Sequence, residues 1–333
     1  MPEKIKSIAI IGDGGWGTTL AIHLHHKGYS VKIWGPFPDY IQELNKTREN
    51  KKYLPGIKIP AAIRITDDLR DVLKDSQLIV LAIPSQFVRK VLKLLKKFDL
   101  SKKILLSAVK GVEEKSLRRI SDIISEELGR ITLAVLSGPT IAYEVAHRIP
   151  TTAVIASKNK KTAGDLQKVF NSKTFRIYTN SDVAGVELGG SIKNVIAIAC
   201  GVCDGLGFGS NAKAAILTRG LAEMTRLAIA MGAKKTTLFG LSGLGDLATT
   251  AFSPKSRNRF VGEELGKGKT IQHITGNMSM IAEGVTTAKA IYQLSKKHQI
   301  PMPITTEVYN IIYRGKKPQK AVLDLMQRKT KSE

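Results

Sequence analysis

The chain has 333 residues, with 52 Lys and Arg against 28 Asp and Glu, which gives a formal net charge of +24. At roughly 150 residues per domain this length predicts about two domains. A hydrophobic content of 43% with 24% charged residues is typical of a globular protein and excludes collagen-like and disulfide-scaffold classes. With two cysteines and no apolar run near the ~20 residues of a membrane span, we expect a cytoplasmic protein without membrane insertion.

The basic excess runs through both halves of the chain and forms no basic tail. A charge of this size can indicate a nucleic-acid or membrane-surface partner. Most of it comes from lysine, however, whereas bidentate recognition of phosphates and bases favours arginine. The sequence carries no helix-turn-helix, zinc-finger or aromatic-basic RNA-binding pattern. We therefore interpret the charge as a solvated surface and expect no nucleic-acid partner.

The first half of the chain alternates short apolar strands with helical stretches. Strands are predicted at residues 5–11, 30–34, 78–83, 103–107, 131–136, 151–156 and 175–178. A helix is predicted at 18–27, and charged amphipathic segments at 87–97 and 115–128 separate later strands. This β-α-β alternation indicates a doubly wound, mainly parallel sheet covered by helices on both faces.

From residue 181 the pattern changes to helices alone. They are predicted at 183–203, 211–231, 256–266, 285–298 and 304–313. We therefore predict an α/β domain over residues 1–180, followed by an all-helical domain over residues 181–333. The apolar helices of the second domain favour a homodimer.

Residues 12–17 form the pattern G-x-G-x-x-G between the first strand and the first helix. This context is that of a Rossmann-type dinucleotide-binding loop, with NAD or NADP as the expected cofactor. Gly12 permits the tight turn, Gly14 admits the pyrophosphate, and Gly17 lets helix and strand pack closely. A Walker-type phosphate loop is excluded because no Gly-Lys-Ser/Thr follows.

The second strand ends at Trp34, Gly35 and Pro36. An acidic residue at this strand end would bind the ribose hydroxyls of NAD, and an arginine would accommodate the extra phosphate of NADP. Neither is present at the strand end, so the sequence leaves the choice between NAD and NADP open.

Several polar residues stand where a ligand is expected. Lys110 and the segment 137–140 each follow a strand, and ligands of open α/β sheets bind beyond the carboxyl ends of strands. Lys193 interrupts an apolar helical run after two glycines, which predicts a buried lysine able to act as general acid or base. Asp246 lies in a glycine-rich apolar turn, and residues 256–258 open a helix with Ser, Arg and Asn, a phosphate-binding pattern.

These motifs, with residues 188–194, 218–224 and 243–247 and the pair Glu283-Gly284, occur in the order and spacing of bacterial NAD(P)-dependent glycerol-3-phosphate dehydrogenase. The chain resembles that family from residue 5 to about residue 325. The resemblance implies interconversion of dihydroxyacetone phosphate and sn-glycerol 3-phosphate by hydride transfer, which feeds phospholipid synthesis. The hydride comes from the nicotinamide, so no metal is expected.

The resemblance also implies roles for individual residues. Lys193 corresponds to the proton donor and acceptor, Lys110 to a residue that contacts substrate and cofactor, and Asp246 to the carboxylate beside the catalytic lysine. With the glycine loop included, the expected cofactor contacts are Gly12, Gly14, Gly15, Trp16, Gly17, Lys110, Ala142, Arg257, Ile281 and Glu283. The expected substrate contacts are Lys110, Gly138, Thr140, Lys193, Asn194, Asp246, Ser256, Arg257 and Asn258.

Two features depart from the family pattern. Many bacterial relatives carry Arg or His where this chain has Pro36. Cys200 and Cys203 form a C-x-x-C pair, which is open to a redox role or half of a zinc site, although we expect structural thiols.

The sequence features also fit, less completely, two different kinds of protein. One is a dehydrogenase of the same fold that acts on hydroxy acids or 6-phosphogluconate. The second is a nucleic-acid-binding protein with a degenerate Rossmann domain, which the net charge would suit. A serine hydrolase fits poorly, because residues 240–244 lack the second glycine of the nucleophile elbow.

Overall fold

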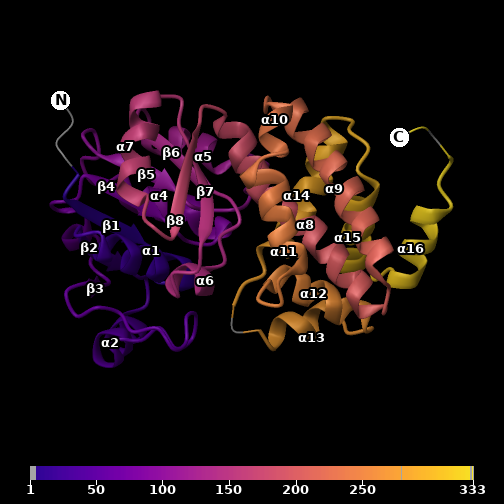
Figure 1. Cartoon of the computed structure of the whole chain (residues 1–333), viewed down its shortest axis with the longest axis horizontal. Coiled ribbons are helices and arrows are strands. Elements are labelled where there is room, and N and C mark those ends of the chain that lie inside the picture. Colours follow the sequence, from indigo (N-terminus) through magenta and orange to yellow (C-terminus); the bar gives the residue numbers. More distant parts are fainter. Residues whose placement is uncertain (1–4, 279, 331, 333) are drawn as a thin grey trace. The chain divides into compact units, whose positions relative to one another are not determined.

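The computed structural model describes residues 5–278, 280–330 and 332. The chain groups into two compact units, drawn mostly in indigo to magenta and mostly in salmon to yellow in Figure 1. Unit 1 comprises Met1–Lys110 and Arg118–Glu187, and unit 2 comprises Gly111–Leu117 and Leu188–Glu333. The division into domains at residues 180 and 181 stays a prediction.

Unit 1 is built on an eight-stranded sheet with the order β3-β2-β1-β4-β5-β6-β7-β8. Neighbouring strands are parallel except for the antiparallel pair β6 and β7, which confirms the mainly parallel sheet. The sequence predicts seven of these strands but not the three-residue β3. The strands are β1 (Ser7–Ile11), β2 (Ser30–Trp34), β3 (Arg64–Thr66), β4 (Leu78–Leu81), β5 (Ile104–Ser107), β6 (Thr132–Ser137), β7 (Thr151–Ala156) and β8 (Phe175–Asn180).

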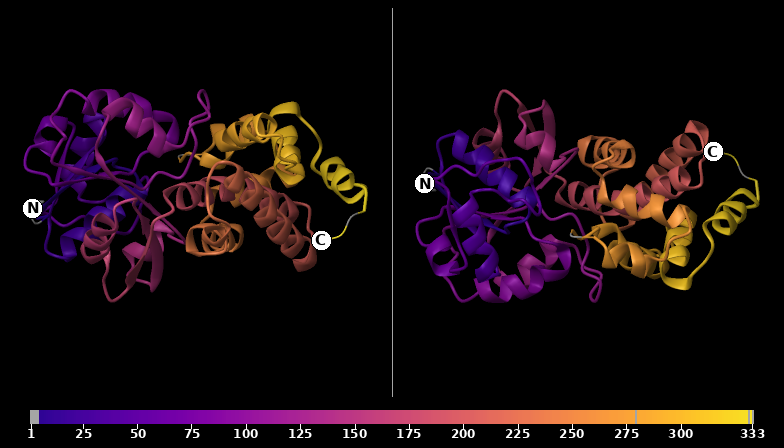
Figure 2. Two further views of the ribbon diagram at one scale, coloured as in Figure 1. Left: turned by 90° about the horizontal axis from the view of Figure 1, so that it is seen from above. Right: turned by 90° about the horizontal axis from the view of Figure 1, so that it is seen from below.

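Helices cover both faces of this sheet, as Figure 2 shows. Successive residues of a strand point to opposite faces, so Ile8 and Ile10 join one buried cluster and Ala9 and Ile11 the other. The first cluster includes residues of α1 (Gly15–His26), α2 (Pro38–Thr47) and α7 (Lys160–Phe170). The second includes residues of α3 (Leu69–Leu73), α4 (Val88–Leu95) and α5 (Ile120–Leu128). Two short elements, η1 (Ser85–Phe87) and α6 (Ala142–Ala146), complete the unit.

Helix α5 begins later than the amphipathic pattern from residue 115 suggests. Leu117 has a left-handed backbone with φ of 59°, which ends any helix there. At the first turn of α5, the Ser121 backbone N–H and hydroxyl donate to the two carboxylate oxygens of Glu187, at 2.7 and 2.6 Å. The start of the helix is therefore fixed by a buried carboxylate distant in sequence, which a local pattern does not reveal.

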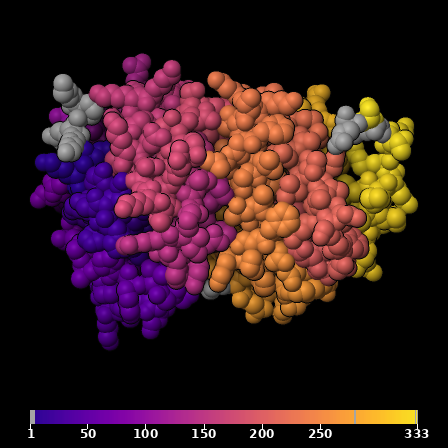
Figure 3. All heavy atoms as spheres, viewed as in Figure 1, coloured from indigo at the N-terminus to yellow at the C-terminus, as the bar shows by residue number. Residues whose placement is uncertain are grey.

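From residue 188 to residue 330, the elements of unit 2 among the described residues are all helices, as the sequence predicts, whereas Gly111–Leu117 contains no helix. Beyond α8 (Val183–Gly205), its elements are α9 (Ser210–Ala230), α10 (Lys235–Leu238), η2 (Leu241–Gly245), α11 (Asp246–Phe252), α12 (Arg257–Gly266), α13 (Ile271–Gly276), α14 (Glu283–Lys297), α15 (Pro303–Arg314) and α16 (Pro318–Met326). The five predicted helices correspond to α8, α9, α12, α14 and α15. The last helix, α16, lies at the surface of the unit, in yellow in Figure 3.

Helix α8 corrects one expectation. It is long and apolar enough to span a membrane by length and composition, whereas the sequence patterns predict no such segment. Its most apolar window is completely buried inside the structure, however, so it is the core helix of this fold. Glycines allow α12 to pack directly on its backbone. A Cβ on Gly201 of α8 would lie 2.0 Å from the Arg259 carbonyl oxygen. A Cβ on Gly262 of α12 would likewise lie 2.0 Å from the Ile198 carbonyl oxygen.

Candidate active site

The glycine loop of unit 1 packs closely against the first strand and leaves open space at the N-terminus of α1. Gly12 has φ of +128°, and a Cβ there would lie 2.3 Å from the Ala82 carbonyl oxygen. A Cβ on Gly17 would lie 2.0 Å from the carbonyl oxygen of Gly12, so strand and helix pack without side chains between them. Gly14 is the N-cap of α1 and has open space where a Cβ would lie. The N-terminus of α1, which is the positive end of the helix dipole, is therefore not obstructed by a side chain at Gly14. This arrangement suits a phosphate group.

The residues after the loop connect it to α6. The Thr19 hydroxyl donates to the carbonyl oxygens of Gly15 and Ala142, at 2.8 and 3.2 Å. Trp16 packs edge-on against Phe175, with 6.5 Å between ring centroids. Three predicted cofactor contacts, Gly15, Trp16 and Ala142, therefore lie in one part of the unit. Thr19 connects two of them and is not predicted by the sequence, because its pattern is that of an ordinary helical residue.

The structure brings Lys110, Gly138 and Thr140 together at the ends of β5 and β6. The ammonium group of Lys110 donates to the Gly138 carbonyl oxygen at 2.8 Å and to the Thr140 hydroxyl at 3.2 Å. Gly138 has φ of +133°, which turns the chain sharply after β6. Both loops follow the carboxyl ends of parallel strands, the edge at which such sheets bind ligands.

In unit 2, Lys193 of α8 is buried against the first turn of α11. Its ammonium group lies 2.9 Å from Oδ1 of Asp246 and donates to the Thr250 hydroxyl at 2.6 Å. The Thr250 hydroxyl in turn donates to the Asp246 carbonyl oxygen at 2.7 Å. Lys193 is 6% exposed and Asp246 is 1% exposed, so the charge pair is nearly shielded from water. The predicted burial of Lys193 is confirmed, and Thr250 is a partner that the sequence motifs do not single out.

Gly189 explains how α8 and α11 come close enough for this contact. A Cβ on Gly189 would lie 2.6 Å from the Ser242 carbonyl oxygen in η2. Residues 243–247, which the sequence predicts as a turn, are instead the end of this π-helical segment and the start of α11. A π-helical turn inside a helix is rare and is frequently found at functional sites. It places Asp246 at the first position of α11, beside Lys193.

The predicted phosphate-binding residues open α12. Ser256 is the N-cap, and its hydroxyl accepts from the Arg259 backbone N–H at 3.2 Å. The buried Asn258 side chain donates to Oδ1 of Asn194 at 2.9 Å and accepts from the Gly284 backbone N–H at 2.9 Å. Asn258 therefore holds α8, α12 and the start of α14 in one arrangement.

Arg257 lies beside the two remaining predicted cofactor contacts. Its guanidinium donates to the Ile281 carbonyl oxygen at 2.9 Å. Burial lowers the pKa of Arg257, and the charge of the nearby Glu283 carboxylate acts in the opposite direction. The N-terminus of α12 thus presents a cation and backbone N–H groups together, which is a suitable binding site for a phosphate.

The two cysteines, Cys200 and Cys203, lie at buried positions of α8. Both are free thiols, and burial raises the pKa of Cys200 to about 12. Within the described part of the chain, no group of three or more His, Cys, Asp and Glu side chains is arranged to hold a metal ion. Burial and a raised pKa are the properties of structural thiols.

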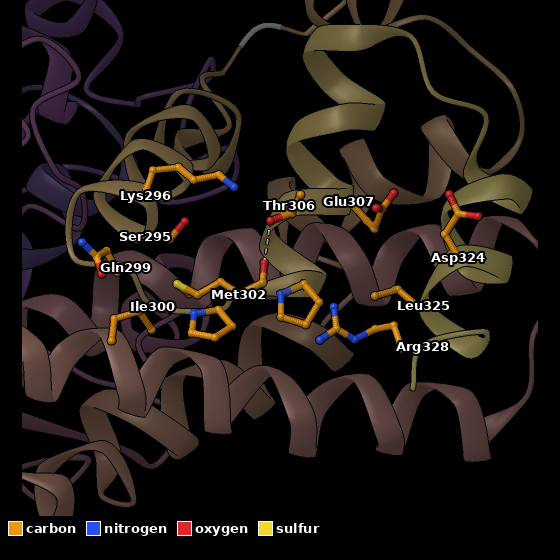
Figure 4. A pocket seen from close by; sticks show the side chains of 12 residues that line it. Ser295, Lys296, Gln299, Ile300, Met302, Thr306, Glu307, Asp324, Leu325 and Arg328 are labelled. Carbon is orange, nitrogen blue, oxygen red and sulfur yellow. Dashed lines mark hydrogen bonds between the residues drawn. The ribbon is translucent and has the colours of Figure 1, made fainter. Parts of the chain in front are cut away.

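A pocket of about 440 Å³ lies elsewhere in unit 2, between the end of α14, α15 and α16 (Figure 4). None of the predicted site residues lines it. Its two carboxylates, Glu307 and Asp324, both pair with Lys316. This pairing gives them a structural role, and we assign the pocket no part in the chemistry.

Comparison with known proteins gives matches over nearly the whole chain. The profile described as NAD-dependent glycerol-3-phosphate dehydrogenase N-terminus matches residues 7–163, and the C-terminus profile of the same family matches residues 182–323. Glycerol-3-phosphate dehydrogenase [NAD(P)+] of Prosthecochloris aestuarii is 48% identical over 98% of this chain and 99% of its own length.

Solved structures of glycerol-3-phosphate dehydrogenases are also similar to nearly the whole of this chain. The Coxiella burnetii glycerol-3-phosphate dehydrogenase superimposes with a TM-score of 0.95 at 38% identity, covering 97% of this chain and 99% of that chain. The Saccharomyces cerevisiae enzyme gives 0.82 at 30% identity, covering 98% and 100%. The resemblance seen in the sequence motifs is confirmed: the chain belongs to the NAD-dependent glycerol-3-phosphate dehydrogenase family.

Proposed function

We propose that this chain interconverts dihydroxyacetone phosphate and sn-glycerol 3-phosphate, with NAD(H) or NADP(H) as the second substrate. Family membership over the whole chain supports this activity. The single observation that carries the chemistry is the buried ammonium group of Lys193, held by Asp246 and Thr250. The family match alone does not show where a proton donor lies in this chain, whereas the contacts of Lys193 do.

The residues of unit 1 suit a dinucleotide. Gly12, Gly14 and Gly17 shape the loop, and the N-terminus of α1 would hold the pyrophosphate. We assign Gly15, Trp16 and Ala142 to the same cofactor, and Arg257, Ile281 and Glu283 of unit 2 as further contacts. When bound in its reduced form, the cofactor supplies the hydride that the ketone carbon accepts.

Lys193 supplies the proton that this reduction needs. Negative charge develops on the ketone oxygen as its carbon is reduced, and an ammonium group at that oxygen protonates it to the alcohol. In the reverse direction the neutral amine takes the proton from the hydroxyl. Asp246 stabilises the ammonium form, and Thr250 fixes the direction in which it points. Lys110 provides a second cation, positioned by Gly138 and Thr140.

The start of α12 would bind the phosphate of the substrate. Ser256 and the first backbone N–H groups lie at the positive end of the helix dipole, and Arg257 adds a full positive charge. Asn258 carries two amide hydrogens, of which Asn194 receives one, so the other is a further donor for the phosphate or its neighbours.

The cellular role follows from the product. A glycerol 3-phosphate produced in the cytoplasm is a precursor of phospholipids, and we propose that supply as the role of this chain. We also propose that it acts as a homodimer, without nucleic-acid partners or membrane insertion. The even spread of lysine over the sequence and the complete burial of the apolar window of α8 support the last two points.

Replacement of the proposed proton donor tests the assignment. Lys193→Ala should lower kcat for dihydroxyacetone phosphate by roughly 100-fold or more, the usual contribution of general acid catalysis. Small primary amines added to the buffer should restore part of the rate. Lys320→Ala is the matched control, because Lys320 is an exposed lysine paired with Asp324 at 2.9 Å, and its kcat should stay near that of the wild type.

Thermal melting must accompany this comparison, since the variant leaves the buried Asp246 without its counter-ion. A folded Lys193→Ala enzyme with nearly normal kcat would contradict the role of Lys193.

A further inference from the structure

The second residue of the glycine loop, Asp13, carries a carboxylate that the proposed chemistry has not used. Its side chain reaches the end of β2. A Cβ placed on Gly35, the residue after that strand, would lie 2.3 Å from Oδ2 and 2.6 Å from Cγ of Asp13. The carboxylate therefore occupies the space that a side chain at position 35 would take.

This carboxylate is buried but incompletely satisfied. Asp13 is 9% exposed, and its Oδ2 has no hydrogen-bond partner among the described residues. Burial raises the pKa of Asp13, while its own backbone N–H and the charge of Lys52 act in the opposite direction. A buried acceptor without a donor is costly unless a ligand supplies the donor.

The surrounding structure holds Asp13 in this position. The fully buried Asn50 donates to the Asp13 carbonyl oxygen and to the Thr18 hydroxyl, both at 2.7 Å. The Tyr40 hydroxyl donates in turn to Oδ1 of Asn50 at 2.7 Å. The backbone beside the carboxylate is thus fixed by Asn50, whose Oδ1 also accepts from the Tyr53 backbone N–H at 3.1 Å.

The position is the one at which dinucleotide-binding folds recognise the adenosine ribose. An acidic residue at the end of the second strand ordinarily accepts a hydrogen bond from the ribose 2′-hydroxyl. Here the strand end consists of Trp34, Gly35 and Pro36, which offer no carboxylate. Glycine at position 35 leaves room for a carboxylate from the loop instead.

We propose that the Asp13 carboxylate accepts a hydrogen bond from the 2′-hydroxyl of the adenosine ribose and makes this enzyme selective for NAD(H) over NADP(H). The proposal rests on the dehydrogenase function proposed above. A 2′-hydroxyl supplies the donor that Oδ2 lacks. A 2′-phosphate would place its negative charge against a poorly hydrated carboxylate, and repulsion would weaken binding.

The strongest opposing feature is Lys52, which could attract a 2′-phosphate. Its ammonium group lies over the rings of Tyr53 and Tyr40, 5.2 and 5.9 Å from their centroids. The Lys52 ammonium group thus already makes cation–π contacts with both rings. If Lys52 governed the choice, NADPH would bind better than NADH, and Lys52→Ala would remove that advantage.

Fluorescence titration of the purified chain with NADH and with NADPH tests the proposal without any turnover. We expect NADH to bind the wild type at least roughly tenfold more tightly. Asp13→Ala should weaken NADH binding by roughly tenfold or more, as expected for a lost hydrogen bond to a charged group. Asp13→Asn keeps the size and an acceptor, so it should retain much of the NADH affinity while binding NADPH better than the wild type does.

Asp39→Asn is the control, because Asp39 is an exposed carboxylate at the start of α2, just beyond the same strand end. Its ratio of NADH to NADPH affinity should be unchanged. Equal or tighter NADPH binding by the wild type, or an unchanged ratio in both Asp13 variants, would overturn the proposal for Asp13. If neither NADH nor NADPH bound at all, the proposed function would be overturned instead.

Discussion

At the scale of single residues, the ion pair between Lys193 and Asp246 explains more about function than about stability. Taking two charges out of water costs free energy that their attraction only partly returns, so buried pairs are weak stabilisers. This pair is nevertheless almost fully buried, with 2.9 Å between Nζ and Oδ1. We interpret the pair as a means of keeping one ammonium group in a fixed place for proton transfer.

Arg257 has a different role, which predicts a different kinetic effect. Arg257→Ala should mainly raise KM for dihydroxyacetone phosphate, because in its proposed role the guanidinium would bind the phosphate in ground and transition states alike. Arg226→Ala is the control, since the Arg226 guanidinium donates to the Pro301 carbonyl oxygen, at 3.0 Å, away from the predicted site residues. Steady-state kinetics of the two variants provide the measurement. An unchanged KM in Arg257→Ala would place the phosphate elsewhere.

The two thiols are expected to be inert while the chain is folded. Burial raises the pKa of Cys200 to about 12 and also raises that of Cys203. The thiolate is the reactive form, and at roughly pH 8 a thiol with a raised pKa is almost entirely protonated. Ellman's reagent should therefore label the native chain very slowly and both cysteines rapidly in guanidinium chloride. Rapid labelling of the native chain would indicate a redox or metal-binding role after all.

At the scale of elements, the contact between α8 and α12 depends on glycines. Gly201→Ala should lower the free energy of unfolding by about 1–3 kcal/mol, since the added methyl would meet the Arg259 carbonyl oxygen at 2.0 Å. Gly164→Ala is the matched control, because Gly164 lies inside α7 and a Cβ there meets nothing within 4 Å. That variant should instead gain roughly 0.5–1 kcal/mol. Urea unfolding of both variants measures these changes. Equal changes in the free energy of unfolding would contradict the importance of the glycine contact.

An element can be predicted from the sequence when its buried positions form a local pattern of apolar residues. An element that is fixed by contacts with residues distant in sequence cannot be predicted in this way. Residues 78–81 of β4 are apolar at every position because both faces of a parallel sheet are covered. Strand β3 has only three residues, which is too few to show a repeating pattern of apolar residues. The first turn of α5 is bound by Glu187, and the π-helical turn η2 lies against Gly189. Neither partner is visible in a window of sequence.

The candidate site shows the same division. Lys193 is predictable because a charge interrupts an apolar helix, and Ser256 because a serine precedes a helix. Thr250 and Thr19 are not, since a threonine on a helix carries no signal of its partner. Asp13 escapes prediction for a further reason: the acid is expected on the strand, whereas the carboxylate reaches the strand end from the loop.

At the scale of the whole molecule, the net charge of +24 far exceeds the few cations assigned to ligands. In the function proposed above, Lys110, Lys193 and Arg257 would each meet a group of the cofactor or the substrate, both of which carry phosphates. The remaining basic residues are spread along the chain. A field of this sign raises the local concentration of anionic ligands and is screened by salt, so it favours both substrates without selecting either.

Reduction of a phosphorylated ketone by a nicotinamide cofactor is the activity on which all these roles depend. It can be measured as loss of the reduced-cofactor absorbance on adding dihydroxyacetone phosphate, with NADH and NADPH in parallel and unphosphorylated dihydroxyacetone as the comparison substrate. We expect rapid oxidation that depends on the phosphate, with NADH the better cofactor. Absence of oxidation with either cofactor would contradict the assigned activity.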